Sequence, residues 1–305
     1  MKKTFLLAIL LAAQTRSGFC QHSGNVAYGQ PYGRARAEQI EAAKRTLSPA
    51  EMPPGSNCMF LEASVLMNVK GDEYVAVFGL SVESATVAEC NEKMDALVRE
   101  FTDALKPLGL AANDWFVDFV AQNRIYGYRV DGNVAKEELT GFELKKNVAI
   151  RYRDGLLLDK LMVAASRLKI YDLIKVDYIV KDQPAVQERL LTEAAGILKQ
   201  KAARYEKLLG IKLLTPPQVY AEKPSIHYPG QMYDSYVAYE GERVDRPLFQ
   251  SKYLIQDLRK ARTSYFNPLS GDGFDLVINP VVVEPVVQFT LYLKVKYDMA
   301  PRGKK

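Results

Sequence analysis

Apolar-rich runs with turn-forming residues between them predict β-strands after residue 58 and near the end of the chain. Met59 to Val69 and Tyr74 to Val82 are two such runs, separated by the sequence Lys-Gly-Asp at residues 70–72. Because glycine and aspartate favour tight turns between strands, we expect these runs to form a β-hairpin. Apolar and polar residues alternate most regularly from Val287 to Tyr297, which predicts a strand inserted in a sheet.

Apolar residues at spacings of three and four predict three amphipathic helices. The first begins after Thr86, where Glu89 completes a capping-box pattern, and it ends near Gly109. The second follows Asp154, and the longest starts at Asp182 and stops at Gly210. Helices on one face of a largely antiparallel sheet would bury all of these stripes, so the predicted fold class is α+β. The remaining strands are expected at Trp115 to Arg129, Gly141 to Tyr152, Ile174 to Val180 and Lys212 to Tyr220, with a turn region at residues 131–138.

The first 20 residues have the features of a secretory signal peptide. Lys2 and Lys3 are followed by an apolar stretch, Phe5 to Ala13, that is too short to span a bilayer. Gly18 and Cys20 are the small residues expected at positions −3 and −1 of a cleavage site. We therefore expect cleavage after Cys20 and export to the periplasm, with no transmembrane span.

The rest of the chain divides by composition into five further segments. We expect an N-terminal arm at residues 21–57 and an α+β domain at 58–222. A segment rich in Pro, Gly and Tyr at 223–277 is predicted to be an insertion, and residues 278–299 to complete the domain with the terminal strand. A basic tail occupies residues 300–305.

The charge of the chain changes when the signal peptide is removed. The whole sequence has 41 Lys and Arg against 36 Asp and Glu, a net charge of +5. Residues 1–20 contain three basic residues and no acidic ones, so the mature chain has 38 basic and 36 acidic residues, a net charge of +2. This near neutrality argues against nucleic acid or an anionic membrane as the partner.

The few histidines and cysteines limit the chemistry that the chain could perform. His22 adjoins the cleavage site and His227 lies alone in a loop, so zinc sites and hydrolytic triads lack the spaced partners that they need. We expect no catalytic residue, metal or cofactor, and hence a protein that is not an enzyme. Cys58 and Cys90 would come close if the predicted hairpin leads into the first helix, which suggests a disulfide; the alternative is that Cys90 packs in the core.

Tyrosines are concentrated in the segment 223–277, where Tyr233, Tyr236 and Tyr239 lie among prolines and glycines. Tyrosine offers a large contact area with a polar tip, which suits a protein interface or stacking against a sugar. The alternative is a long loop folded over the core of its own domain.

Several phrases of the sequence, taken in order, resemble the SIMPL-domain family. They are Gly71-Asp72 followed by Val75, Val77 and Gly79; Ala88, Asn91 and Met94; Thr140-Gly141-Phe142; Val148 with Ile150 to Tyr152; Lys201-Ala202; and Leu208 to Gly210, together with the closing strand. The resemblance implies an α+β domain in the periplasm or cell envelope, often self-associating, in proteins linked to envelope or oxidative-stress defence without an established catalytic activity. It supplies no active-site residues.

Together these observations predict an exported, non-enzymatic envelope protein that forms homo-oligomers and has a structural or stress-protective role. The alternative function is a periplasmic binding module in which the tyrosine-rich segment holds a glycan or a hydrophobic ligand. Envelope proteins or glycans are the expected partners.

Overall fold

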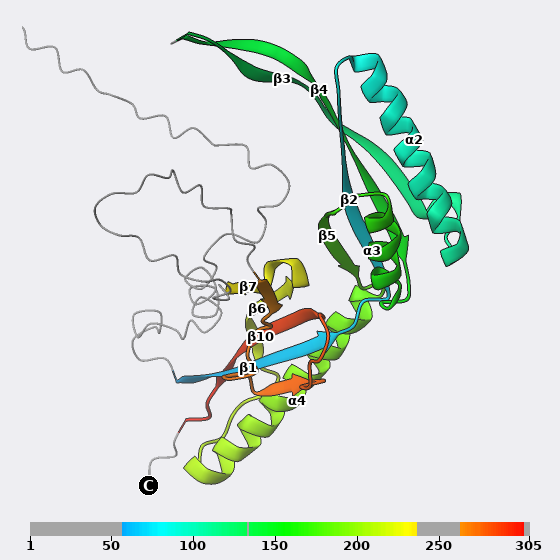
Figure 1. Ribbon diagram of the computed structural model, residues 1–305. Helices are drawn as coiled ribbons and strands as arrows, with labels where there is room; N and C mark the ends of the chain where they lie inside the picture. Colours follow the sequence, from blue (N-terminus) through cyan, green and yellow to red (C-terminus); the bar gives the residue numbers. More distant parts are fainter. Residues whose placement is uncertain (1–56, 133, 237–262, 302–305) are drawn as a thin grey trace, which may run out of the picture.

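The computed structural model describes residues 57–132, 134–236 and 263–301 (Figure 1). These residues form two four-stranded sheets, one covered by a single helix and the other by two, and one small two-stranded sheet. The predicted α+β class, with mostly antiparallel strands, is confirmed. The predicted signal peptide, residues 21–56 of the predicted arm and residues 302–305 of the basic tail lie outside the described residues.

The first sheet has the strand order β6 (Gln218–His227), β10 (Val287–Asp298), β1 (Cys58–Val69) and β9 (Leu276–Ile278). β10 is antiparallel to both β6 and β1, whereas β9 runs parallel to β1. The prediction that the terminal strand is inserted in a sheet is therefore confirmed. β6 starts just after Pro217, later than predicted, and it accommodates Pro224 because it is an edge strand.

The helix α4 (Gln183–Leu209) covers one face of this first sheet (Figure 1). Its start is capped by Asp182, whose carboxylate accepts a hydrogen bond from the backbone N–H of Ala185 at 3.0 Å, and Gly210 ends it with a left-handed φ of 62°. Both caps agree with the prediction. The apolar stripe of α4 packs on the inward side chains of β1 and β10, among which Phe289 is almost completely buried.

The second sheet has the strand order β3 (Trp115–Asp131), β4 (Val134–Tyr152), β2 (Glu73–Ser84) and β5 (Asp172–Ile179), and all its pairs are antiparallel. The helices α2 (Val87–Leu105) and α3 (Leu157–Arg167) cover one face of it. Thr86 caps α2 as predicted, accepting a hydrogen bond from the backbone N–H of Glu89. Phe78 of β2 meets Phe101 of α2 edge to face, with ring centroids 5.5 Å apart.

The predicted hairpin between residues 59 and 82 is wrong, because β1 and β2 belong to different sheets. β1 pairs with β10 and β9, and β2 pairs with β4 and β5. Residues 70–72 therefore connect the two sheets instead of reversing the chain, and the backbone N–H of Asp72 donates to the carbonyl of Ile179 at 2.8 Å. An alternating pattern shows which face of a strand is buried, but it does not identify the neighbouring strand.

The remaining described elements are short. β7 (Tyr233–Tyr236) and β8 (Thr263–Phe266) form the third sheet, and 3-10 helices occur at Lys106–Leu108, Ala112–Asp114 and Pro229–Gln231. The segment 223–277 contributes the second half of β6, both strands of this small sheet and the first two residues of β9. None of the described helices combines the length and apolar character needed to cross a membrane.

Candidate functional site

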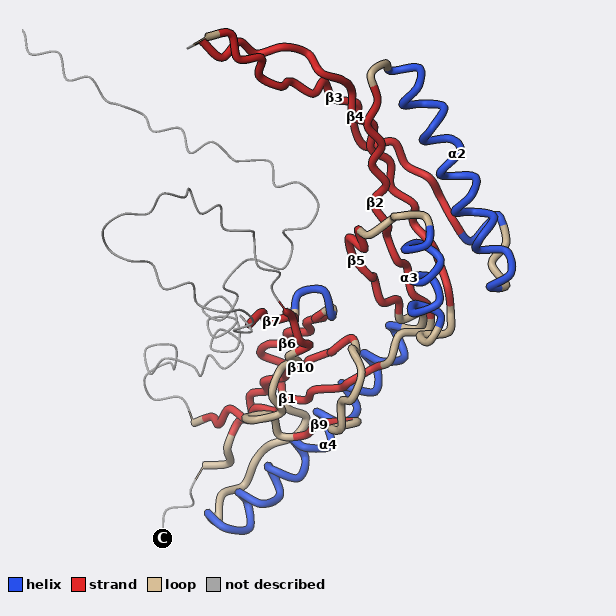
Figure 2. Tube along the Cα trace, viewed as in Figure 1, coloured by secondary structure: helices blue, strands red, loops and turns tan. Residues whose placement is uncertain are grey.

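The β3–β4 hairpin extends well past the rest of its sheet (Figures 1 and 2). β2 stops pairing with β4 at Ser84, which lies opposite Phe142, so residues 125–141 continue as a ribbon of two strands. We call this ribbon the arm from here on; it is distinct from the N-terminal arm predicted at residues 21–57. The region 131–138, predicted as a turn, is mostly strand, because β4 begins at Val134.

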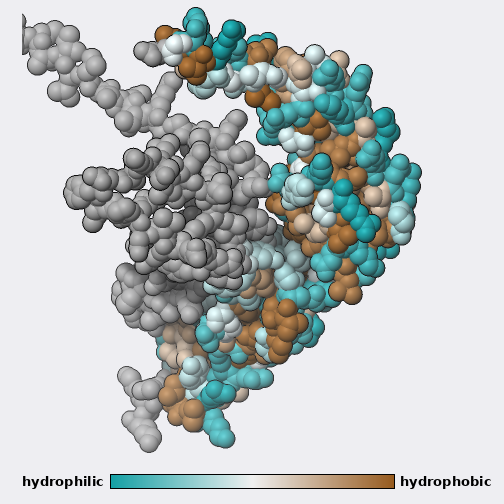
Figure 3. Space-filling model, in the orientation of Figure 1, coloured by the Kyte–Doolittle hydropathy of each residue, from teal (hydrophilic) through white to brown (hydrophobic). Residues whose placement is uncertain are grey.

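One face of the arm is largely apolar and exposed. The register pairs Tyr126 with Leu139, Tyr128 with Glu137 and Val130 with Ala135, so these six side chains share a face. The exposed fractions are 50% for Tyr126, 74% for Tyr128, 71% for Val130 and 50% for Leu139. In Figure 3 the arm shows hydrophobic residues interspersed with hydrophilic ones. On β3, Gln122 pairs with the buried Leu144 on the side of the sheet that α2 covers. Tyr126 and Tyr128 lie an even number of residues after Gln122, so the apolar face of the arm continues this side of the sheet.

The opposite face of the arm is mostly polar. It carries Arg129, Asp131, Lys136 and Glu138 beside one exposed valine, Val134, and the guanidinium of Arg129 lies 3.6 Å from the carboxylate of Glu138. Charged side chains on one face keep that face in water. The arm is therefore an amphipathic ribbon. Its charged face is suited to contact with water, whereas its apolar face is not.

A bulge at Thr140 sets which residues form the two faces. The register shifts between Ile125 and Tyr126, so that Thr140 of β4 has no opposite residue, and its hydroxyl donates to the carbonyl of Ile125 at 3.1 Å. A Cβ atom at Gly127 would lie only 2.7 Å from the methyl carbon of Thr140. Glycine at position 127 thus makes room for the bulge and keeps Tyr126 and Leu139 on one face.

A cluster of charges lies at the end of the second sheet where the chain passes between the two sheets. Glu73, the first residue of β2, accepts hydrogen bonds from Lys181 at 2.8 Å and from Arg153 at 3.1 Å. Asp72 accepts a further bond from the backbone N–H of Lys181 at 2.8 Å. These contacts link the β1–β2 connection to the β5–α4 connection. The hydrogen bonds from Lys181 and Arg153 lower the pKa of Glu73 below its ordinary value.

The lowered pKa of Glu73 predicts a stability that depends on pH. The pKa of this carboxyl group is lower in the folded than in the unfolded protein, where it is near 4.5. Its carboxylate therefore stabilises the fold fully at a pH above 4.5, and this contribution is lost as the pH falls through the folded pKa. The substitution Glu73→Gln should therefore lower the melting temperature at pH 7, and the gap to wild type should narrow below about pH 4.5. Thermal unfolding at pH 7, 5 and 3 measures this gap; a gap independent of pH would contradict the assignment.

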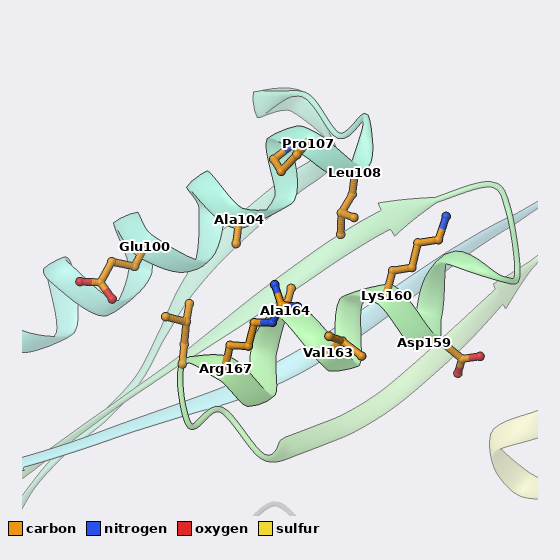
Figure 4. A pocket seen from close by; sticks show the side chains of 10 residues that line it. Glu100, Ala104, Pro107, Leu108, Asp159, Lys160, Val163, Ala164 and Arg167 are labelled. Atoms are coloured by element: carbon orange, nitrogen blue, oxygen red, sulfur yellow. The ribbon is translucent and has the colours of Figure 1, made fainter.

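A groove lies between the last turns of α2 and the outer face of α3 (Figure 4). It encloses about 570 Å³, and Ala104, Leu108, Val163, Ala164 and Leu168 give it an apolar floor. Charged residues from both helices, including Glu100, Lys160 and Arg167, stand at its rim. An apolar floor with a charged rim suits a hydrophobic ligand better than a polar one.

The structure places the three candidate tyrosines differently. Tyr233 begins β7 and packs against Phe266 of β8, with ring centroids 5.7 Å apart. Burial, followed by the proximity of Tyr233, raises the pKa of the Tyr178 hydroxyl on β5, so Tyr233 lies against the body of the protein. Tyr236 ends β7, and Tyr239 lies outside the described residues. For Tyr233, packing on the domain describes the contacts better than an open interface.

The structure does not bring the two candidate cysteines together. Cys58 starts β1 in the first sheet, whereas Cys90 is buried on α2 against the second sheet, and no disulfide joins them. The Cys90 thiol lies 3.2 Å from the carbonyl of Phe142. The proximity expected from the predicted hairpin does not arise, because that hairpin does not form.

This placement predicts that Cys90 resists modification in the folded protein. A buried thiol held against a carbonyl reacts slowly with an aqueous reagent, whereas the same thiol reacts freely after unfolding. Labelling with iodoacetamide before and after denaturation, followed by peptide mapping without reductant, should show Cys90 modified only in the unfolded sample. A peptide in which Cys58 is linked to Cys90 would contradict the arrangement.

The arm was not among the sites predicted from the sequence. Its signal was present in the alternation of Tyr126, Tyr128 and Val130 with Gly127, Arg129 and Asp131. The same alternation also fits a half-buried strand, so the pattern alone does not reveal exposure. Within the described residues, no group of three or more His, Cys, Asp or Glu side chains is arranged to hold a metal ion.

Comparison with known proteins identifies the family. No curated protein matches the chain. The family profile of SIMPL, described as a protein of unknown function (DUF541), matches residues 62–253. This range covers most of β1, all of β2 to β7, the α-helices α2, α3 and α4 and the arm, which is more than half of the chain. The chain therefore belongs to the SIMPL family.

Proposed function

We propose that this protein is an exported, non-enzymatic protein of the cell envelope that self-associates and has a structural or stress-protective role. The observation that carries the proposal is the arm, whose apolar face is exposed along several residues of both strands. Exposed apolar patches rimmed by polar residues are typical of surfaces that bind another protein. Association would remove this face from water.

The arm also needs a partner for its own stability. A ribbon of two strands without a third strand or a covering helix is marginally stable in water. Among the residues that the structure describes, no neighbouring strand pairs with the backbone N–H and C=O groups along either edge of the arm, since β3 is an edge strand of its sheet and β2 ends at Ser84. Unpaired edges of this kind are ready to pair with another chain.

The charged residues of the second sheet support a structural role more than a catalytic one. The pKa of Asp114 is lowered by the guanidinium of Arg151, which donates to it at 2.8 Å, and by the backbone N–H of Ala111. Burial would raise the pKa of Glu143, but hydrogen bonds from Lys145, Ser81 and Asn123 outweigh it and lower the pKa. A general acid or base works best with a pKa near the operating pH, and these carboxylates are shifted away from it.

Export rests on the signal-peptide features of residues 1–20. The expected mature chain begins at Gln21 and is recovered from the periplasmic fraction. Sequencing of the N-terminus of the protein after osmotic shock tests this part of the proposal. Recovery of an uncleaved chain from the cytoplasm would contradict it.

Self-association is tested by the mass of the mature protein in solution. We expect light scattering on residues 21–305 at micromolar concentration to give at least twice the mass of one chain. A strict monomer up to 100 times that concentration would refute self-association, and with it this proposed function.

A second candidate function is the binding of a hydrophobic ligand, and the groove between α2 and α3 favours it. If the groove binds such a ligand, the fluorescence of anilinonaphthalene sulfonate should rise on addition of the folded protein. The rise should be lost in Val163→Asp and kept in Val120→Asp, which changes an exposed valine on β3 away from the groove. Equal fluorescence in both variants would exclude the groove as the binding site.

A further inference from the structure

We propose that two copies of the protein pair through the arm, with the β3 strands antiparallel and the two-fold axis at Tyr128. This inference rests on the proposed self-association and names the surface and the partner: a second copy of the same chain. It would join the two second sheets into one continuous sheet. The argument follows from the edges, the faces and the charges of the arm.

The β3 edge suits pairing better than the β4 edge. Along β4, the arm presents Lys136, Glu137 and Glu138 in succession, and charged residues on an edge oppose pairing with another strand. If two β4 strands paired antiparallel about the middle of the arm, with their apolar residues on the same face, the two Glu137 side chains would lie opposite each other. Along β3, the arm has only two charged residues, Arg129 and Asp131, and they are not adjacent.

A register centred on Tyr128 aligns the apolar faces of the two copies. Tyr128 would lie opposite Tyr128, and Tyr126 opposite Val130 of the second copy, once on each side of the axis. A shift that pairs odd-numbered with even-numbered residues would set the apolar face of one arm beside the polar face of the other. Favourable cross-strand contacts include those between two aromatic residues and those between an aromatic and a β-branched residue.

The same register also matches the charges. Arg129 would lie opposite Gly127 of the second copy, which has no side chain and whose own cross-strand partner is Glu138. The guanidinium of Arg129 could thus reach Glu138 of the second copy as it reaches Glu138 of its own chain, at 3.6 Å. A register centred on Arg129 would instead place two arginines opposite each other, which is unfavourable.

Two-fold symmetry also makes a second copy a suitable partner. Two-fold pairing uses the same surface on both chains and closes at two copies, the commonest form of oligomer. A bulge at Val120 on β3 interrupts the regular edge before the arm, which limits the pairing to the projecting ribbon. The arm extends away from its own helices and sheets, so the two bodies can remain apart (Figure 1).

The experiment compares wild type with two single variants of the arm by analytical ultracentrifugation of residues 21–305. Tyr128→Glu places two carboxylates at the axis and should weaken dimerisation by about 100-fold or more. Lys136→Glu is the matched control, because it introduces the same residue on the polar face of β4, and it should leave the dimerisation constant within about threefold. Far-UV circular dichroism and melting curves verify that both variants fold.

A charge exchange tests the register. Arg129→Glu should weaken the dimer, and the double variant Arg129→Glu with Glu138→Arg should restore most of the affinity, because it recreates the pair in both copies. If both variants are as weak as each other, the register centred on Tyr128 is wrong.

The remaining outcomes separate this inference from the proposed function. If wild type and Tyr128→Glu both associate with equal affinity, the arm is not the contact, while self-association stands. If wild type is a monomer, both ideas fail. If that monomer floats with vesicles of phosphatidylethanolamine and phosphatidylglycerol and Tyr128→Glu does not, the apolar face binds lipid and the pairing is overturned.

Discussion

The substitution Phe101→Ala should lower the free energy of unfolding by about 3–5 kcal/mol. Phe101 has no exposed surface and meets the buried ring of Phe78 edge to face at 5.5 Å, where α2 packs on the second sheet. Truncation would remove the transfer free energy of the ring, leave a cavity and break the aromatic pair. Urea unfolding followed by circular dichroism measures the difference from wild type.

An exposed phenylalanine of the same sheet provides the control for this prediction. Phe116 of β3 is 68% exposed, so Phe116→Ala should change the free energy of unfolding by less than about 0.5 kcal/mol. Equal losses for the two variants would mean that α2 does not cover the sheet as described.

The second large effect is expected at the ion pair of a buried lysine on the outer face of the first sheet. The ammonium of Lys294 on β10 lies 2.6 Å from the carboxylate of Glu62 on β1, and only 4% of its side chain is exposed. The rings of Phe60 and Tyr220 flank the ammonium at 5.6 and 5.9 Å from their centroids. Glu62→Leu would leave a buried cation without its carboxylate and should cost about 3 kcal/mol.

Removal of both charges should reverse most of this loss. The double variant Glu62→Leu with Lys294→Met keeps the side chains apolar and leaves no buried charge, so its stability should return to within about 1 kcal/mol of wild type. The exposed pair of Lys106 and Asp103 is the control, since Lys106→Met should have little effect. A double variant as unstable as Glu62→Leu would show that the loss comes from packing and not from the unpaired charge.

Local signals predicted the helices well. Thr86, Asp182 and Gly210 occupy the capping positions expected from the sequence, because capping depends on bonds between residues that are close in the chain. The terminal strand was also predicted, since its alternation is long and regular. These features need no knowledge of the rest of the fold.

The pairing of β1 could not be predicted in the same way. Its true partner β10 lies more than 200 residues later, and the two strands match along their whole length from Cys58 with Asp298 to Val69 with Val287. The nearby turn sequence at residues 70–72 favoured the local alternative. Strand choice depends on which faces bury most apolar area in the whole molecule, and a single sequence does not show this.

The arm could not be predicted as a site from the sequence for a similar reason. The alternation around Tyr128 was visible, but the exposure of these side chains depends on where β2 ends and α2 begins relative to the β3–β4 hairpin. Composition marked the tyrosines near residue 233 as interface candidates, with packing on their own domain as the alternative, and Tyr233 packs against Phe266. The arm, in contrast, has several exposed apolar residues on one face, among them Tyr126, Tyr128, Val130 and Leu139.

Disulfide trapping at the two-fold axis tests the central claim most directly. In a variant with Cys58→Ser, Cys90→Ala and Tyr128→Cys, the two introduced thiols should face each other at a distance that a disulfide can bridge. Mild oxidation of this protein, from residue 21 onward, should give a covalent dimer, whereas Lys136→Cys in the same background should stay largely monomeric. A monomeric Tyr128→Cys protein, or equal cross-linking at both positions, would contradict pairing through the β3 edge.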